Sequence, residues 1–359
     1  FPAWSPDGKK IAFVELKVEN GEPSAALYTA DRDGKNLVQA FSDPKTVPFY
    51  LYWSPDNHNV SFLSSNTGSA GLKLQLVPAA GGDAKTLDVG QPYYWSWSPN
   101  GRQVLVHVGG AAVDSGAHLS LLGIDGDVSE SGLDYKPTYF QAPAWSPDGK
   151  HTLYAAETDN GRVLILADSA GAEQSQLATF EGGIAFGWAP DGKHVAYITG
   201  DAESLGILGT LSIVNPQKPA EAKSVENKPV MAFFWSPDSK QLAYFVPEIV
   251  APTPEPGQQS SGNSQFLVLH LFVASAGDAK SHSVATFIPT RDFYNLLPYF
   301  DQYQQSATLW SPDSQNLVLS AFSPTASGDA KPGVFVVHSS GNLEPRFLKE
   351  GTLGLWSPK

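Results

Sequence analysis

The chain has 359 residues, a formal net charge of −13 at pH 7 and no cysteine. The missing cysteines exclude disulfides, thiol nucleophiles and cysteine-bound metals, and they are in keeping with an exported protein that avoids thiols. The acidic balance and the lack of any basic run argue against a nucleic-acid partner, which needs clustered Lys and Arg. No apolar run reaches the ~18 residues that indicate a membrane-spanning segment.

One phrase, Trp-Ser-Pro-Asp-Gly, opens the chain and returns along it. Its tryptophans are Trp4, Trp53, Trp97, Trp145, Trp188, Trp235, Trp310 and Trp356, spaced 49, 44, 48, 43, 47, 75 and 46 residues apart. The order Ser-Pro-Asp-Gly is typical of a type I turn followed by a left-handed residue, which Gly adopts without strain. Asn57, Ser239 and Ser314 replace that Gly. Because Ser adopts the left-handed region poorly, the two Ser turns are expected to differ from the others.

Each turn is followed by a run rich in β-branched and aromatic residues, the first at 10–14. A second apolar run, a Gly/Asp hairpin and a short third run come next, at 25–30, 31–34 and 37–41 in the first repeat. The chain then enters the strand that ends at the next Trp. Four short strands in about 45 residues, repeated along the chain, predict an all-β fold, a β-propeller of four-stranded blades.

Seven complete units and an eighth Trp allow two arrangements of the ring. In a seven-bladed ring, which we favour, segments 1–4 and 352–356 compete for one place. In the alternative, the last Trp strand belongs to an eighth blade. Either way, residues 1–359 are predicted to form a single β-propeller domain. The seven tryptophans from Trp4 to Trp310 keep a constant phase relative to the turns, so we expect them in equivalent, largely buried places.

The sixth repeat is longer than the others because it carries two insertions. Residues 248–264 contain several Pro followed by a Gln/Ser/Gly run, a composition that predicts a mobile excursion between two strands. Residues 291–306 are aromatic, and we expect this second insertion to pack against the domain.

The segments that lead into the Trp strands are unusually aromatic for connecting loops. In a propeller these segments all cross one face, because each joins an outermost strand to the next innermost one. One explanation is that some rings, Tyr52 and Trp95 among them, begin inner strands and pack in the core. The alternative is an aromatic rim that binds a protein partner, with Tyr93, Tyr139, Phe293 and Tyr299 exposed on one face. The candidate partner-binding residues are Phe49, Tyr50, Tyr93, Tyr94, Tyr139, Phe140, Phe293, Tyr294, Tyr299 and Tyr303.

Catalytic signatures are missing from the sequence. There is no Gly-x-Ser-x-Gly elbow of the serine hydrolases. The histidines show no metal-ligand spacing; they are His58, His107, His118, His151, His194, His270, His282 and His338. We therefore predict no catalytic residue, no metal ligand and no cofactor. A metal site assembled from different blades stays open, because spacing along the chain does not test it.

The phrase Trp-Ser-Pro-Asp-Gly-Lys followed by an apolar strand, as at 4–9 and 145–150, resembles the repeat of the TolB-like propellers, also called WD40-like or PD40 repeats. The resemblance covers nearly the whole chain. In TolB itself the propeller is a periplasmic docking partner for envelope proteins, so the resemblance implies an extracytoplasmic protein, whether periplasmic, cell-surface or secreted. Related propellers precede the hydrolase domain of prolyl-oligopeptidase-like enzymes, and others are pectin-fragment lyases.

Two classes of function follow, because one fold hosts many functions. The first is a non-enzymatic, exported or envelope-associated propeller that acts as a protein–protein interaction or scaffold module. The alternative is a polysaccharide-active enzyme, either a lyase or a hydrolase, or a carbohydrate-binding propeller, with its site at the channel mouth. Three or more His, Asp and Glu side chains converging at one mouth would favour the enzyme. A mouth of aromatic and amide groups would disfavour it.

Overall fold

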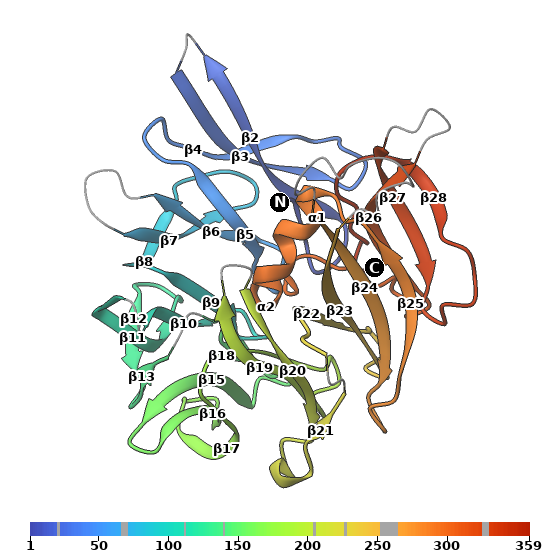
Figure 1. The fold of residues 1–359 in the computed structure, drawn as a ribbon. Helices are drawn as coiled ribbons and strands as arrows, with labels where there is room; N and C mark the ends of the chain where they lie inside the picture. Colours follow the sequence, from blue (N-terminus) through green and yellow to red (C-terminus); the bar gives the residue numbers. More distant parts are fainter. Residues whose placement is uncertain are drawn as a thin grey trace.

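The computed structural model describes residues 1–19, 22–65, 71–110, 113–138, 141–203, 206–225, 228–251, 265–324 and 330–359. In these ranges the chain forms seven antiparallel sheets around a common centre (Figure 1). Each sheet is built from strands that follow one another in the chain, so each sheet is one blade. The predictions of an all-β propeller and of seven blades are confirmed.

The first three blades contain four strands each. Blade one holds β1 (Ala3–Trp4), β2 (Lys10–Glu19), β3 (Glu22–Asp31) and β4 (Val38–Ser42). Blade two holds β5 (Pro48–Trp53), β6 (Asn59–Ser65), β7 (Leu72–Pro78) and β8 (Lys85–Gly90). Blade three holds β9 (Tyr93–Trp97), β10 (Gln103–Gly110), β11 (Val113–Gly123) and β12 (Ser129–Gly132).

The later blades vary this plan slightly. Blade four holds β13 (Lys136–Pro137), β14 (Ala144–Trp145), β15 (His151–Thr158), β16 (Gly161–Asp168) and β17 (Glu173–Phe180). Blade five holds β18 (Gly183–Trp188), β19 (Val195–Glu203), β20 (Gly206–Val214), the short helix η1 (Pro219–Glu221) and β21 (Lys223–Ser224). Blade six holds β22 (Ala232–Trp235), β23 (Gln241–Val250), β24 (Phe266–Ser275) and β25 (Ser281–Phe287). Blade seven holds β26 (Asn316–Pro324), β27 (Ala330–His338) and β28 (Arg346–Glu350), and Trp310 pairs with Leu317 on its inner side.

The turns of the repeated phrase have the same backbone conformation with and without Gly. Asn57, Ser239 and Ser314 have φ angles of 64°, 63° and 61°, in the left-handed region of the turn glycines. The expectation that the Ser turns differ is therefore wrong. The reason is a hydrogen bond between blades: Ser239 Oγ accepts from the backbone N–H of Asp191 at 2.9 Å. Ser314 Oγ accepts in the same way from Asp238 at 3.1 Å.

The repeat tryptophans join neighbouring blades. The indole N–H of Trp53 donates to the carbonyl oxygen of Ala3 at 3.0 Å, and that of Trp310 donates to Phe234 at 2.9 Å. The tryptophans that are buried, as predicted, are Trp53, Trp97, Trp145, Trp235 and Trp310.

Two tryptophans depart from the prediction, because Trp4 and Trp188 are only half-buried. Trp188 lines the central cavity described below, where part of its ring stays uncovered. Trp4 belongs to blade one. The other blades each pack against the blade before them, whereas blade one packs against the C-terminal segment. A Cβ built on Gly8, in the turn after Trp4, would lie 2.7 Å from Ser357 Oγ.

The two ends of the chain do not compete for one place, contrary to expectation. β1 pairs with β2 inside blade one. Near the other end, the backbone N–H of Trp356 donates to the carbonyl oxygen of Thr308 at 2.8 Å, on the inner side of blade seven. Each end therefore has its own hydrogen-bonding edge, and the C-terminal segment lies between blade seven and blade one.

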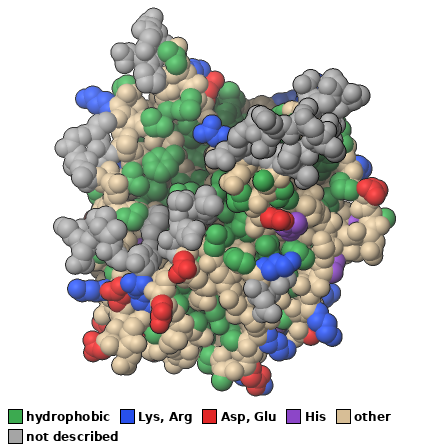
Figure 2. All heavy atoms as spheres, in the orientation of Figure 1, with side chains coloured by type: hydrophobic (Ala, Val, Ile, Leu, Met, Phe, Trp, Pro, Cys, Tyr) green, Lys and Arg blue, Asp and Glu red, His purple; other side chains and the backbone are tan. Residues whose placement is uncertain are grey.

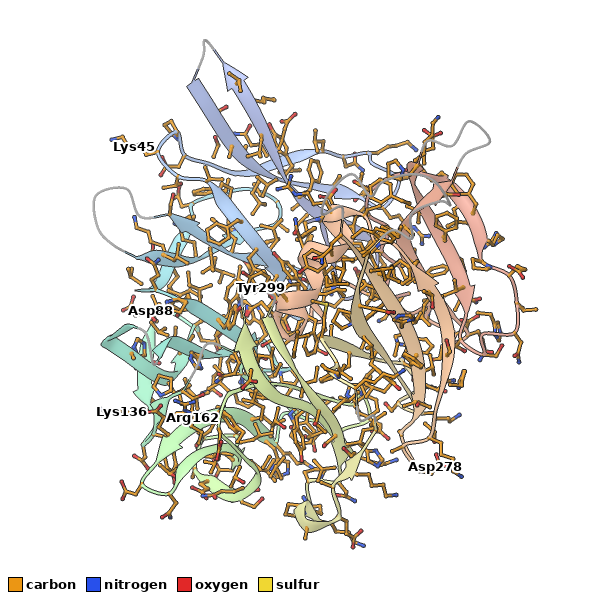
Figure 3. All side chains as sticks on the ribbon, viewed as in Figure 1. Lys45, Asp88, Lys136, Arg162, Asp278 and Tyr299 are labelled. Carbon is orange, nitrogen blue, oxygen red and sulfur yellow. The ribbon has the colours of Figure 1, made fainter. Side chains whose placement is uncertain are left out.

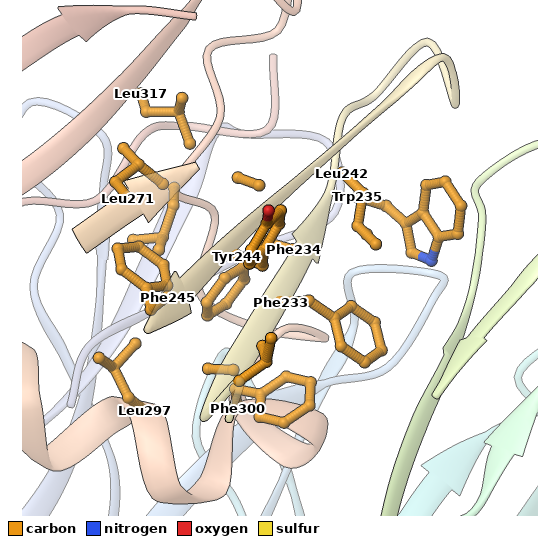
Figure 4. Close-up of a cluster of buried hydrophobic side chains, with 14 of the residues drawn as sticks. Phe233, Phe234, Trp235, Leu242, Tyr244, Phe245, Leu271, Leu297, Phe300 and Leu317 are labelled. Carbon is orange, nitrogen blue, oxygen red and sulfur yellow. The ribbon is translucent and has the colours of Figure 1, made fainter. Parts of the chain in front are cut away.

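Residues 291–306, which we call the plug, form α1 (Arg291–Leu296), η2 (Leu297–Tyr299) and α2 (Phe300–Tyr303). Thr290 caps α1, with Oγ1 accepting from the N–H of Phe293 at 3.3 Å. The plug crosses the middle of the ring (Figure 1) and buries Phe293, Leu296, Leu297 and Phe300. Figure 4 shows Phe300 beside Phe233, and their ring centroids are 4.7 Å apart.

The other insertion is covered only in part. Residues 248–250 belong to β23, and they pair with the beginning of β24. Residues 252–264, which hold most of the predicted mobile excursion, lie outside the described residues.

Candidate functional site

The repeated phrase lines a cavity of about 560 Å³ at the centre of the ring, which we call the funnel. Inner strands alternate their side chains, so the residue before each Trp faces the centre, and the Trp packs toward a neighbouring blade with, in blades three to seven, part of its ring at the cavity. Blades two to seven each contribute that residue and the Pro of the turn. The prolines are Pro55, Pro99, Pro147, Pro190, Pro237 and Pro312, joined by Pro358 of the C-terminal segment.

The wall of the funnel is asymmetric. Blades three, four and five present the small residues Ser96, Ala144 and Gly187 before their Trp. Blades two and six present the large rings of Tyr52 and Phe234 at the same place. The funnel is therefore wider on the side of blades three to five.

Gln304 and Gln305, at the end of the plug, line the funnel opposite the proline turns. Gln304 lies over Gly187, where an added Cβ would come within 2.8 Å of Gln304 Nε2. A glycine on the inner strand of blade five is thus what leaves room for this glutamine. Because the prolines belong to the turns and the glutamines to the plug, the funnel runs from the turns inward to the plug.

Contacts to several blades hold the plug in the channel. The Tyr50 hydroxyl in blade two donates to the carbonyl oxygen of Gln302 at 2.6 Å. The backbone N–H of Ala142, before blade four's inner strand, donates to Asp301 Oδ2 at 2.8 Å. The Tyr303 ring lies 5.0 Å from the rings of both Phe1 and Tyr50. These contacts connect the plug to blades one, two and four, although in the sequence the plug lies between blades six and seven.

Burial shifts the pKa values of the two ionisable groups at the plug and the funnel wall toward their neutral forms. Burial raises the pKa of Asp301 to about 6, although hydrogen bonds from the Ala142 and Gln302 amides favour its charged form. In the funnel wall, Tyr52 is the one ionisable side chain among the described lining residues, and burial raises its pKa above the ordinary value. The funnel surface is therefore neutral at physiological pH.

Four of the rings predicted to bind a partner are buried: Tyr50, Tyr93, Tyr94 and Phe293 are 7%, 1%, 7% and 0% exposed. The expectation that Tyr93 and Phe293 show ring surface on a rim is wrong. The Tyr93 hydroxyl donates to Asp88 at 2.8 Å, on the strand just before it. Phe293 is the first apolar anchor of the plug and packs against rings of blade six.

The remaining predicted rings are distributed differently. Phe49 and Tyr299 are 40% and 49% exposed, and Figure 3 places Tyr299 near the middle of the ring. Tyr294 and Tyr303 are half-buried. Tyr139 and Phe140 lie outside the described residues.

The other explanation for the aromatic segments applies to Trp95, which is fully buried in its inner strand. Tyr52 lies at the funnel wall, and its ring centroid is 6.4 Å from that of Trp95. The sequence analysis placed the enzymatic or carbohydrate-binding alternative at the channel mouth but predicted none of the funnel-lining residues as a site, although one signal pointed to them. A Pro follows the Trp of the inner strand in every repeat, and equivalent positions at the ends of the inner strands lie around the central axis.

The histidines form no metal-binding group with the other described residues. Among the described residues, no group of three or more His, Asp or Glu side chains could hold a metal ion. Burial lowers the pKa of His107 to about 4, so this histidine is neutral and structural. Figure 2 shows Lys and Arg side chains scattered over one face of the molecule and not gathered into a patch. None of the helices in the described ranges is long and apolar enough to span a membrane.

The chain is similar to a family model, to two proteins by sequence and to solved structures by fold. A family model described as the TolB beta propeller domain matches residues 1–191. The uncharacterized peptidase YuxL of Bacillus subtilis is 26% identical over 188 residues, which are 50% of this chain and 26% of that protein. The Tol-Pal system protein TolB of Alcanivorax borkumensis is 33% identical over 67 residues, 19% of this chain and 14% of that protein. The matches thus span about a quarter or less of the length of these relatives.

Among solved structures, the oligogalacturonate lyase of Vibrio parahaemolyticus superposes with a TM-score of 0.56 at 12% identity. The similarity covers 96% of this chain and 86% of that one. At this level of identity the likeness shows the fold alone.

Proposed function

The chain belongs to the TolB beta propeller family, and on that premise we propose that it is a non-enzymatic, exported or envelope-associated propeller that binds a protein partner through the funnel. One observation carries the proposal. The described residues that line the funnel are Trp, Pro, other apolar residues, a few hydroxyls and two carboxamides, with Tyr52 as the sole ionisable group.

This composition supports a binding module over a hydrolase or a lyase. Proton transfer to or from a substrate needs a side chain with a pKa near the working pH, placed within hydrogen-bonding reach. Metal-assisted chemistry needs several His, Asp or Glu ligands together. The funnel lining supplies neither set, and Tyr52 holds its proton at neutral pH.

The polar groups of the wall favour a peptide over a sugar. The hydroxyls of Ser96, Ser146 and Thr308 each already take part in a hydrogen bond within the chain. A sugar ring buried in the funnel would leave most of its own hydroxyls unpaired, which is costly. An extended apolar or Pro-rich segment makes fewer demands, because aromatic-lined grooves bind such segments mainly by packing.

The proposed location is outside the cytoplasm. The absence of Cys and the match to a Tol-Pal system protein support it. Fractionation of cells that make the protein tests it with an antibody: recovery in the periplasmic, surface or secreted fraction is expected, and recovery with cytoplasmic markers contradicts it.

A cavity-filling variant tests binding at the funnel. Ala144→Trp adds an indole to the wide side of the funnel, and Ala170→Trp adds one to an exposed hairpin outside it. On an array of Pro- and Leu-rich octapeptides, the unmodified chain and Ala170→Trp are expected to bind the same subset. Ala144→Trp is expected to lose that binding by more than about tenfold at an unchanged melting temperature.

Two results contradict the proposal. One is equal peptide binding by Ala144→Trp, which would place the binding outside the funnel. The other is turnover of polygalacturonate or of peptides by the purified chain, which would favour the enzymatic alternative.

A further inference from the structure

The base of the funnel differs in origin from its wall. The wall repeats one phrase blade after blade, but Gln304 and Gln305 come from the plug. We infer that these two glutamines select the segment that the funnel binds: they favour an apolar peptide whose leading residue carries a neutral carboxamide side chain. The inference rests on the proposed function and adds the chemistry of the ligand to it.

The position of Gln304 is set by the inner strand of blade five. Its side-chain amide lies against Gly187, and Nε2 donates to the carbonyl oxygens of Phe186 at 3.5 Å and Asp301 at 3.3 Å. Both bonds are long, so they orient the amide without using its full hydrogen-bonding capacity.

The two carboxamides keep unused hydrogen-bonding groups. Within the described part of the chain, Gln304 Oε1 and the whole side-chain amide of Gln305 make no hydrogen bond. Both side chains are half-buried and line the funnel. A carboxamide offers two donors and one acceptor oxygen, so together they can pair with both the N–H and the C=O of an incoming amide.

The neutral wall decides which ligand ends are rejected. A carboxylate would lose its hydration without meeting a cation, which is costly in an apolar cavity. A purely apolar end would cover the two carboxamides and leave their polar atoms unpaired. A neutral amide avoids both penalties, and the apolar remainder of the peptide packs against Trp and Pro.

The experiment uses two octapeptides of Pro and Leu that carry fluorescein at the N-terminus and a C-terminal dimethylamide, so that the tested side chain is the one primary carboxamide at that end. They differ only in the last residue, Asn or Leu, which have similar shape. Fluorescence anisotropy measures their Kd for the full chain. The Asn peptide is expected to bind about tenfold more tightly, the value of one net hydrogen bond.

Variants of the chain test whether the two glutamines cause the preference for the Asn peptide. The double change Gln304→Leu with Gln305→Leu is expected to abolish or reverse it. Gly187→Ala is expected to reduce it with both glutamines present, because the new methyl group displaces the Gln304 amide. Gln217→Leu, on an exposed loop of blade five, is the matched control and is expected to keep the tenfold preference.

The outcomes separate the inference from the proposed function. If both peptides bind the unmodified chain and lose binding in Ala144→Trp, but the preference for Asn survives in the double variant and in Gly187→Ala, the inference is overturned and the proposed function stands. If neither peptide binds the unmodified chain more tightly than Ala144→Trp, both fail.

Discussion

The ring and the plug are held together in different ways. In the ring, one set of contacts recurs: the turn Ser hydroxyl donates to the Asp two residues on, at 2.7 Å for Ser5 and 2.7 Å for Ser146. In the plug, each contact occurs once, such as the Ala142 amide on Asp301. Repetition yields a neutral wall built from equivalent positions, whereas the unique segment supplies the buried carboxyl and the two half-buried carboxamides. On the proposed function, the repeat gives the funnel its shape and the insertion gives it its selectivity.

The largest expected effect is on the packing of the ring. Trp53→Ala removes a fully buried indole and its hydrogen bond to Ala3, and it should lower the free energy of unfolding by about 3–5 kcal/mol. Phe300→Ala is the corresponding change in the plug. If the plug and the ring unfold as one unit, its loss of unfolding free energy lies in the same range. Urea denaturation measures both, with Leu37→Ala, 58% exposed, as the surface control.

Either of two results would break the comparison. A loss for Trp53→Ala no greater than for Leu37→Ala would mean that the repeat tryptophans do not carry the ring. A separate early transition in Phe300→Ala would mean that the plug unfolds on its own.

The next effect concerns pH, and it has opposite signs in plug and ring. The folded pKa of Asp301 is about 6, above the ordinary value of 3.8, so the folded state binds more protons between these values. Stability from this group therefore falls as pH rises from about 4 to 6, by up to about 3 kcal/mol. Asp301→Asn removes this component. The stability of the unmodified chain minus that of the variant should decrease with pH across the window.

Asp148, in a turn of the ring, has a pKa shift of the opposite sign. The Ser146 hydrogen bond and then the Lys150 amide lower the pKa of Asp148, so its contribution is present above pH ~4 and is lost as pH falls further. The difference between the unmodified chain and Asp148→Asn should thus decrease on acidification. Parallel pH profiles for the two variants, from urea denaturation at pH 3 to 7, would contradict the assignment of Asp301.

The smallest effect tests the turns that lack glycine. Ser239→Ala removes the bond to the Asp191 amide and keeps a Cβ at a φ of 63°, so a loss of about 1–2 kcal/mol is expected. Ser239→Gly also removes the bond but relieves the backbone, so its loss should be smaller. Thermal unfolding of the two variants compares them. Equal losses would show that the left-handed backbone carries no strain there.

The blades could be predicted because their signals are local and recur. The Ser-Pro-Asp order specifies a turn, and a constant Trp phase specifies equivalent places in a ring. The same reasoning failed for the Ser turns, because the compensating bond of Ser239 comes from Asp191 in another blade. It also failed for the ends of the chain. Trp356 pairs with Thr308, so β1 can pair with β2 without competition from the C-terminal segment.

The candidate site divides in the same way. The aromatic segments were visible in the sequence, but whether Tyr93 is buried or exposed depends on what packs against it. The funnel wall follows from the repeat, yet its base follows from a segment with no repeat partner.

Short-range chemistry is sufficient for the positions of the turns, for the strands and for the repeated blade, because each depends on residues a few positions apart or on a pattern repeated along the chain. The position of the plug depends on pairs that no local pattern specifies. Tyr50 and Gln302 are 252 residues apart, and Ala142 and Asp301 are 159 apart. These pairs meet only when the ring has closed around the channel, where the Gln302 carbonyl oxygen and the Asp301 carboxylate find their buried partners.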